Sequence, residues 1–281
     1  TNVRTPLAIF ASLVNYITWV ICTIPVAIEV LFMLLPASLG ITQYTDPQFA
    51  RVLFWFFGHP LVYFWLLPAY VSWYTMLPKQ AGGKSLTPRG SKVAFLFFLV
   101  FSIPTGVHHM FSDPGVSSTA KGIHTIFTFM VAVPSFMTAF NIGASLEMAG
   151  RKNGAKGLFD WMWKQKWASP VVAAQLVAMM QFLSGGITGL VQASAELNIT
   201  LHNTSWIPGH FHQTLGGAVT MTYIGIMYWM LPMITGRRLL SNKVALAQIA
   251  TWFIGMVVFG FSMGEAGLFG VPRRALTGSA P

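Results

Sequence analysis

Long apolar segments separated by short polar ones extend along the whole chain. A helix needs roughly 20 apolar residues to cross the hydrocarbon core of a bilayer, and about seven segments reach that length. They are predicted at residues 7–35, 51–77, 92–112, 122–148, 169–195, 208–234 and 243–269. The pattern predicts an all-α membrane protein, a bundle of about seven transmembrane helices in a single domain that covers residues 1–281.

The composition supports this interpretation. Hydrophobic residues make up 54% of the chain and charged residues only 9%, with a mean hydropathy of +0.61, whereas a soluble domain has about 25% charged residues. The net charge of +10 comes from basic residues in the connecting segments. It therefore reflects membrane topology, and we expect no nucleic-acid partner. The single cysteine, Cys22, lies in an apolar segment, so the chain cannot form an internal disulfide.

The connecting segments also predict an orientation. Most of the 17 Lys and Arg residues lie on one side of the membrane, chiefly in segments 79–92 and 151–166. Basic residues favour the cytoplasmic side, so that side is predicted to face the cytoplasm and the other side is the outer one. The chain starts at Thr1 and reaches the first apolar segment almost at once. We therefore expect a fragment that lacks earlier helices.

All seven histidines fall in the outer half of the predicted spans or in an outer loop. A lone histidine in a membrane helix often makes a hydrogen bond between helices. Ionisable groups are costly in a bilayer and usually mark a function, and imidazole is the commonest metal ligand. Histidines at a similar depth on three predicted helices therefore indicate a transition metal or haem: His59, His108, His109, His210 and His212.

Three of these histidines can meet at one ion. His59 lies about 12 Å below the outer end of the second span, and His108 and His109 close the third span on the same side. Neighbouring residues of a regular helix point about 100° apart, but Pro104 and Gly106 are expected to distort that turn. Three imidazoles with an open position suit copper or iron that handles a small molecule.

The remaining two histidines need separate partners. His210 and His212 open the sixth span, and residues two apart on an α-helix point about 200° apart, so they cannot bind the same ion. Two haems on opposite faces of the helix fit this arrangement, each with one axial imidazole. Phe211 would then lie between them and give electrons a short path.

Three segments carry a family resemblance: GHPLVYFWLLPAY from Gly58, HHMFSDPG from His108 and HNTSWIPGHFH from His202. Together they resemble subunit 1 of the haem–copper oxygen reductases, and in particular the B-type branch that contains the ba-type cytochrome c oxidases. The resemblance extends over all seven spans. It implies that the bundle is part of the larger helix bundle of that subunit.

The resemblance implies roles for the histidines. His59, His108 and His109 match the copper ligands, His210 the axial ligand of the high-spin, dioxygen-binding haem, and His212 an axial ligand of the low-spin haem. The implied cofactors are two haems and one copper ion, with a b-type low-spin haem and an a-type high-spin haem.

Tyr63 matches the tyrosine that is covalently joined to the first copper ligand. His59 and Tyr63 are four residues apart and so share a helix face. Tyr63 lies about 18 Å deep, which is too deep for a residue of the interfacial aromatic belt. A phenol there supplies an electron and a proton for O–O cleavage, so Tyr63 and His59 are the predicted catalytic residues.

Further positions match residues around the haems and along a proton route. Haem propionates are predicted to be held by Arg273, Arg274, His202 and Asn203, because guanidinium groups pair with carboxylates. The B-type proton pathway is matched by Tyr70, Tyr74, Ser135 and Thr138. Tyr63, Tyr70 and Tyr74 are spaced by seven and four residues, which keeps their hydroxyl groups on one helix face.

Some positions depart from the family or have no role. Leu61 follows Pro60 where the A-type branch has Glu, which favours the B-type branch. Asn198 stands where B-type relatives carry an acid near the propionates. No histidine precedes His59, so the second ligand of the low-spin haem must come from outside this chain. His124 is unassigned, and packing or surface exposure is its simplest explanation.

The resemblance implies a terminal respiratory oxidase, a transmembrane catalytic domain that reduces dioxygen to water and takes up and translocates protons. Its implied partners are an oxidase subunit 2 with a copper site that receives electrons, cytochrome c or a similar donor, dioxygen and the lipid bilayer. The implied location is the plasma membrane of a prokaryote, with several membrane passes.

Two alternatives remain. A nitric oxide reductase on the same scaffold would carry non-haem iron, lack Tyr63 and add glutamates near the metal, whereas Glu29 is the one obvious acid in the first three spans. A metal-free channel or transporter could use buried histidines as a proton relay.

Overall fold

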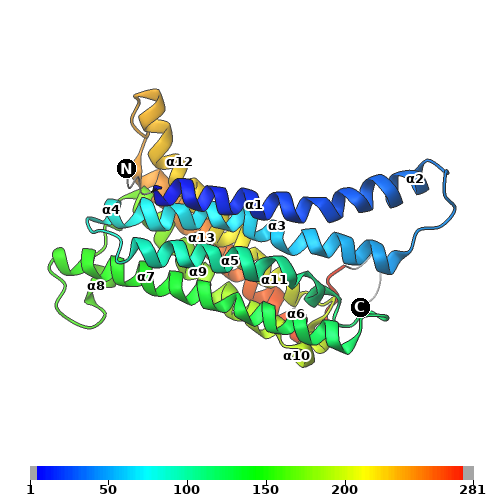
Figure 1. The fold of residues 1–281 in the computed structure, drawn as a ribbon. Coiled ribbons are helices and arrows are strands. Elements are labelled where there is room, and N and C mark those ends of the chain that lie inside the picture. The colour runs from blue at the N-terminus through cyan, green and yellow to red at the C-terminus, as the bar shows by residue number, and fades with distance from the viewer. Residues whose placement is uncertain (1–4, 275–281) are drawn as a thin grey trace. The chain divides into compact units, whose positions relative to one another are not determined.

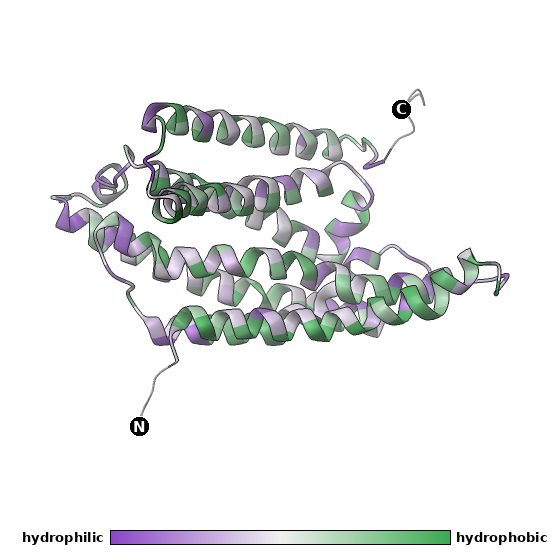
Figure 2. Ribbon diagram, turned by 90° about the horizontal axis from the view of Figure 1, so that it is seen from above, coloured by the Kyte–Doolittle hydropathy of each residue, from purple (hydrophilic) through white to green (hydrophobic). Residues whose placement is uncertain are grey.

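In the computed structural model, which describes residues 5–274, seven helices are long and apolar enough to cross a membrane. The prediction of seven spans is confirmed, with ends shifted by a few residues. Figure 2 shows apolar positions along the middles of these helices and polar ones at their ends. The spans are Leu7–Ser38, Pro47–Ala81, Pro88–Met110, Ser118–Lys152, Pro170–Ala193, Trp206–Thr235 and Asn242–Leu268.

The helices drawn in Figure 1 divide into two compact units. The first unit contains the chain up to Pro68 together with Arg89–Met137 and Gln192–Thr200. The second contains Ala69–Pro88, Thr138–Val191 and the chain from Leu201 onward. The single-domain interpretation of residues 1–281 stays a prediction.

In the first unit α1 (Leu7–Glu29) packs on the early part of α3 (Pro47–Thr75). The Asn15 side-chain amide donates to the Phe64 carbonyl at 3.2 Å, and the Trp19 ring lies 5.6 Å from Phe57 and 4.4 Å from Phe64. After α1 the chain continues through a π-helical turn, η1 (Val30–Leu34), into α2 (Leu35–Ser38). Aromatic packing therefore holds these two spans together.

The first unit also contains the segment that carries two of the candidate ligands. α5 (Pro88–Ser102) begins with a proline, which is favourable at the first helical position, and passes into the 3₁₀-helix η2 (Ile103–Met110). The next helix, α6 (Ser118–Met130), is capped by Ser117, whose hydroxyl accepts from the Ala120 amide at 3.2 Å. α6 packs against η2, so the two elements support each other.

In the second unit the end of α3 packs on most of α9 (Pro170–Ala193) through polar contacts. Ser72 donates to Gln175 Oε1 at 2.6 Å, and Gln175 donates to Gln80 Oε1 at 2.9 Å. Ser72 and Gln175 are buried, and a buried polar group must find a hydrogen-bond partner. These bonds therefore join the end of this span, including α4 (Leu77–Ala81), to α9.

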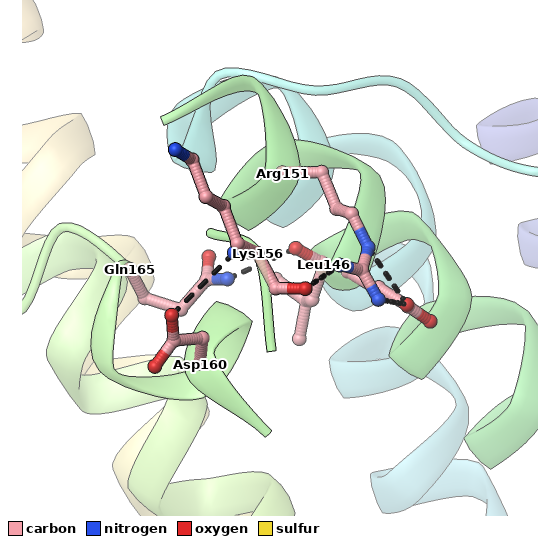
Figure 3. A network of polar contacts seen from close by, with 6 residues as sticks. Leu146, Arg151, Lys156, Asp160 and Gln165 are labelled. Atoms are coloured by element: carbon pink, nitrogen blue, oxygen red, sulfur yellow. Dashed lines mark hydrogen bonds and ion pairs between the residues drawn. The ribbon is translucent and has the colours of Figure 1, made fainter. Parts of the chain in front are cut away.

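A polar network orders the loop between α7 (Ala132–Lys152) and α9, which includes α8 (Asp160–Trp163) (Figure 3). Arg151 pairs with Glu147 at 2.7 Å and donates to the Lys156 carbonyl at 3.1 Å. Gln165 donates to the carbonyls of Leu146 and Trp161, at 2.9 and 2.6 Å. This loop is one of the two basic segments whose charges predict the cytoplasmic side.

The last spans of the second unit come very close together. They begin with α11 (Trp206–Phe211) and the π-helix η3 (His212–Val219), followed by α12 (Thr220–Thr235) and α13 (Asn242–Leu268). A Cβ on Gly209 would lie 2.7 Å from the Gly260 carbonyl oxygen. Small residues at such crossings let helix backbones approach each other in a membrane, and here they bring α11 against α13.

Candidate metal centre

Three imidazoles converge in the first unit, one from α3 and two from η2. The ring centroids of His59 and His108 are 4.3 Å apart, those of His59 and His109 5.3 Å, and those of His108 and His109 4.2 Å. One ring nitrogen from each lies within 4.8 Å of the others, and His59 Nδ1 is 3.1 Å from His109 Nε2. Nitrogens this close can bind one ion at metal–nitrogen distances of about 2 Å.

The backbone of η2 makes the convergence possible. Pro104 has φ −87° and ψ 40°, which breaks the helical path, and the next residues wind as a 3₁₀-helix rather than an α-helix. A Cβ on Gly106 would overlap the carbonyl oxygen of Trp55, so only glycine lets η2 approach α3 this closely. The expected distortion by Pro104 and Gly106 is confirmed, and it turns His108 and His109 toward His59.

At three successive turns, one face of α3 contacts the metal-binding segment, that is, the chain from η2 to Asp113 that carries His108 and His109. The indole of Trp55 stacks on His109, with centroids 3.9 Å apart and planes at 13°. One turn earlier, Arg51 Nε pairs with Asp113 Oδ2 at 2.6 Å. Residues four apart on a helix share a face, so Arg51, Trp55 and His59 all contact the same segment. Trp55 was not among the residues predicted from the sequence, although its spacing of four residues from His59 is a usable signal.

Tyr63 lies beside the first histidine, as its spacing predicts. Its ring centroid is 4.8 Å from that of His59, in an edge-on arrangement at 64°, and 6.0 Å from that of Phe98. The phenol is thus held against the metal-binding cluster by one helix and one aromatic neighbour. The covalent link between Tyr63 and His59 stays a prediction.

In the second unit His210 faces α9. Its Nδ1 lies 2.8 Å from the Gly185 carbonyl oxygen and 3.1 Å from the Thr188 hydroxyl. A Cβ on Gly189 would lie 2.7 Å from His210 Cε1, so a glycine makes room for the ring. Metal-binding histidines commonly donate from their other ring nitrogen to a carbonyl in this way, and the bond leaves Nε2 of His210 available to a metal.

His212 faces α13 instead. Its Nδ1 lies 2.7 Å from the Pro208 carbonyl oxygen, and its ring centroid is 4.6 Å from that of Phe259. The two imidazoles therefore diverge, as their spacing predicts. The helix is not regular, however, because α11 ends at Phe211 and η3 continues as a π-helix. π-Helical turns are often found at functional sites.

The predicted propionate residues gather on two chain segments of the second unit. Arg273 N donates to the Asn203 carbonyl at 2.6 Å, and an isolated bridge joins Thr204 to Pro272. The Arg273 guanidinium lies 5.6 Å from the Phe211 ring. Burial and the neighbouring charge of Arg274 lower the pKa of Arg273, so an anion such as a carboxylate would stabilise its charged form.

Other polar groups are found around these segments. His202 is half-buried, while Asn203 and Arg274 are exposed. Trp206 Nε1 is buried without a hydrogen-bond partner, a second residue that the sequence analysis missed. A buried N–H donor without a partner fits a site completed by a negatively charged group. Together these donors form a region that can bind an anionic group such as a carboxylate.

One hydrogen bond directly joins two residues of the predicted proton pathway. Tyr74 donates to Thr138 Oγ1 at 2.8 Å, and both residues are buried. Tyr70 is fully buried, with its ring 5.1 Å from Trp73 and 5.4 Å from Phe182. Ser135 donates to the Val131 carbonyl at 3.0 Å within its own segment. The structure thus joins Tyr74 to Thr138, and the pathway as a whole stays a prediction.

Asn198 is buried in the first unit. Its side-chain amide donates to the Gln192 carbonyl at 2.8 Å. Its Oδ1 is buried without a hydrogen-bond partner. The carboxamide is therefore a fixed, neutral group at this position.

Three imidazoles that meet in one cluster, and two more that diverge on another span, define a multi-pass membrane protein with candidate metal-binding histidines. The comparison with known sequences identifies the family. Residues 1–280 match the family described as Cytochrome C and Quinol oxidase polypeptide I, and the chain belongs to it.

Relatives with known names agree with this assignment. Cytochrome c oxidase subunit 1 of Thermus thermophilus is 45% identical over 99% of this chain and 50% of its own length. Cytochrome c oxidase polypeptide 1 of Halobacterium salinarum is 29% identical over 88% of this chain and 40% of its own length. The chain therefore spans about half the length of the curated relatives it matches.

A solved structure has the same fold. One chain of a haem–copper terminal oxidase dimer, determined by cryo-EM, superimposes with a TM-score of 0.93 at 41% identity. The similarity covers 97% of this chain and 49% of that chain. The helical bundle of the haem–copper oxidase subunit 1 is thus the fold of this chain.

Proposed function

We propose that this chain carries the copper and haem-iron ligands of a terminal respiratory oxidase, which reduces dioxygen to water with electrons from cytochrome c or a similar donor. The reaction is coupled to proton uptake and translocation across the membrane. The observation that carries the proposal is the cluster of His59, His108 and His109 with Tyr63 in contact. The printed names of the relatives support it.

The proposed copper site uses His59, His108 and His109. His59 Nδ1 and His109 Nε2 are the nearest nitrogens of their rings, and they would bind the ion from α3 and η2. Copper and haem iron supply the redox chemistry of dioxygen reduction. Tyr63 holds a phenolic proton beside His59 and is the group from which a hydrogen atom can be taken.

The proposed haem ligands are His210, for the high-spin haem, and His212, for the low-spin haem. Each presents Nε2 because its Nδ1 is occupied by a backbone carbonyl. Arg273 and Arg274 would neutralise propionates, assisted by His202 and Asn203. We propose a b-type low-spin and an a-type high-spin haem, with the second ligand of the low-spin haem supplied from outside this chain.

Protons are proposed to reach the site along the hydroxyls of Tyr70, Tyr74, Ser135 and Thr138. The Tyr74–Thr138 hydrogen bond supports this route, because it places two hydroxyls in contact within apolar surroundings. Together with Leu61 after Pro60, it favours the B-type branch. The proposed partners are an oxidase subunit 2 with a copper site that receives electrons and its donor, in a prokaryotic plasma membrane.

The test is to purify the whole oxidase that contains this chain and to record reduced-minus-oxidised spectra with and without carbon monoxide, together with copper and iron contents. Two haems, one of which binds carbon monoxide, with one copper would support the proposal. Iron without copper would favour a nitric oxide reductase instead. An intact assembly without haem would leave a metal-free proton channel.

A further inference from the structure

α6 presents two side chains of one helix face to the metal-binding segment η2. His124 and Thr128 are four residues apart on α6 and therefore lie one above the other. Thr128 has no role predicted from the sequence, but its hydroxyl oxygen contacts the ring of the candidate ligand His108, and its hydroxyl donates to the His124 backbone carbonyl.

Thr128 determines which nitrogen of His108 carries a proton. Its hydroxyl donates to the His124 carbonyl oxygen at 2.5 Å, so its single proton is already used. The same oxygen lies 2.9 Å from His108 Nδ1, where it can act only as an acceptor. His108 must therefore carry its proton on Nδ1, which leaves the lone pair of Nε2 for a metal.

We propose that Thr128 is a positioning residue for the copper ligand His108, whose tautomer it sets. The inference rests on the proposed copper site. Hydrogen-bond partners of metal-binding histidines typically change metal affinity by about 10- to 100-fold when they are removed, and the hydroxyl of Thr128 is such a partner.

The test compares three variants of the whole oxidase. Thr128→Val removes the hydroxyl at nearly constant shape, and Thr128→Ser keeps it. Thr125→Val is the matched control, because Thr125 lies on the same helix and its buried hydroxyl has no hydrogen-bond partner. The readouts are the copper-to-haem ratio after dialysis against a graded series of chelator concentrations, and the infrared stretching band of carbon monoxide bound to copper.

We expect Thr128→Val to lose copper at roughly 10- to 100-fold lower chelator concentration and to shift or broaden the carbon monoxide band. Thr128→Ser and Thr125→Val should match the unaltered enzyme in both readouts. Wild-type copper retention and an unshifted band in Thr128→Val would overturn the role of Thr128. Copper missing from the unaltered enzyme would instead refute the proposed function itself.

Discussion

The indole of Trp55 lies flat on the imidazole of His109, with the ring centroids 3.9 Å apart and the planes at 13°. This stacking ties the orientation of one candidate copper ligand to α3, the helix that also provides His59. The ligand cluster is therefore held on two sides, by α3 through Trp55 and by α6 through Thr128.

Replacing Trp55 tests how much this stacking contributes. Aromatic pairs contribute about 0.5–1.5 kcal/mol beyond the apolar area that they bury. We expect Trp55→Leu to lower copper affinity by about 2- to 10-fold, and Trp55→Phe to retain most of it because a flat ring remains. Chelator titration of the purified oxidase measures this. Equal affinities in the leucine and phenylalanine variants would show that stacking does not position His109.

A methyl group at Gly106 should disrupt the metal-binding segment. The new Cβ would overlap the Trp55 carbonyl oxygen, so η2 must move away from α3, at a cost of about 1–3 kcal/mol for overpacking. We expect Gly106→Ala to lower the thermal midpoint and the copper content together. Gly122→Ala on α6 is the control, because nothing lies within 4 Å of its added Cβ. A Gly106→Ala enzyme with full copper would contradict the close approach.

Gly189 provides a comparable test for His210. An added Cβ would lie 2.7 Å from His210 Cε1, which pushes the ring away from the hydrogen bonds that orient it. We expect Gly189→Ala to lose the haem that binds carbon monoxide, and to keep the low-spin haem. Gly186→Ala should preserve both, because its Cβ meets nothing within 4 Å. Optical spectra with carbon monoxide separate the two haems, and loss of the low-spin signal alone would reverse the assignment.

The hydrogen bond between Tyr74 and Thr138 tests the proposed proton route. Tyr74→Phe keeps the ring and removes the hydroxyl that donates at 2.8 Å. We expect dioxygen turnover to fall by on the order of 10²-fold, the low end for loss of a proton-transfer group, with carbon monoxide binding unchanged. Tyr16→Phe is the control because that side chain is 61% exposed on α1. Unchanged turnover in Tyr74→Phe would exclude this route.

The membrane spans followed from the sequence with small errors in their ends. Apolar length alone predicts a span, because a bilayer offers no water to satisfy the backbone and every spanning segment must form a helix. The first span was predicted at 7–35 and is Leu7–Ser38, and the last was predicted at 243–269 and is Asn242–Leu268. The errors lie at the helix ends, because the residue at which a helix ends depends on local capping rather than on hydropathy.

The histidine cluster was also predictable, because depth in the membrane is proportional to position along a helix. His59, His108 and His109 lie at a common depth, and Pro104 and Gly106 signalled that the turn between them is irregular. That reasoning left open whether the rings converge. Trp55 and Thr128 were not identified because they contact histidines that are far away in the sequence. Trp206 was not identified because its buried N–H is visible only in the structure.

The sequence by itself thus determined the helical class, the number of spans and the set of candidate metal-binding histidines, since these depend on composition and on the 1.5 Å rise of a helix. Only the tertiary structure decided how the ligands are oriented. The stacking of Trp55 on His109, the tautomer of His108 set by Thr128 and the opposite directions of His210 and His212 all depend on contacts between different helices. Such contacts are made by side chains far apart in the chain, and local periodicity carries no information about them.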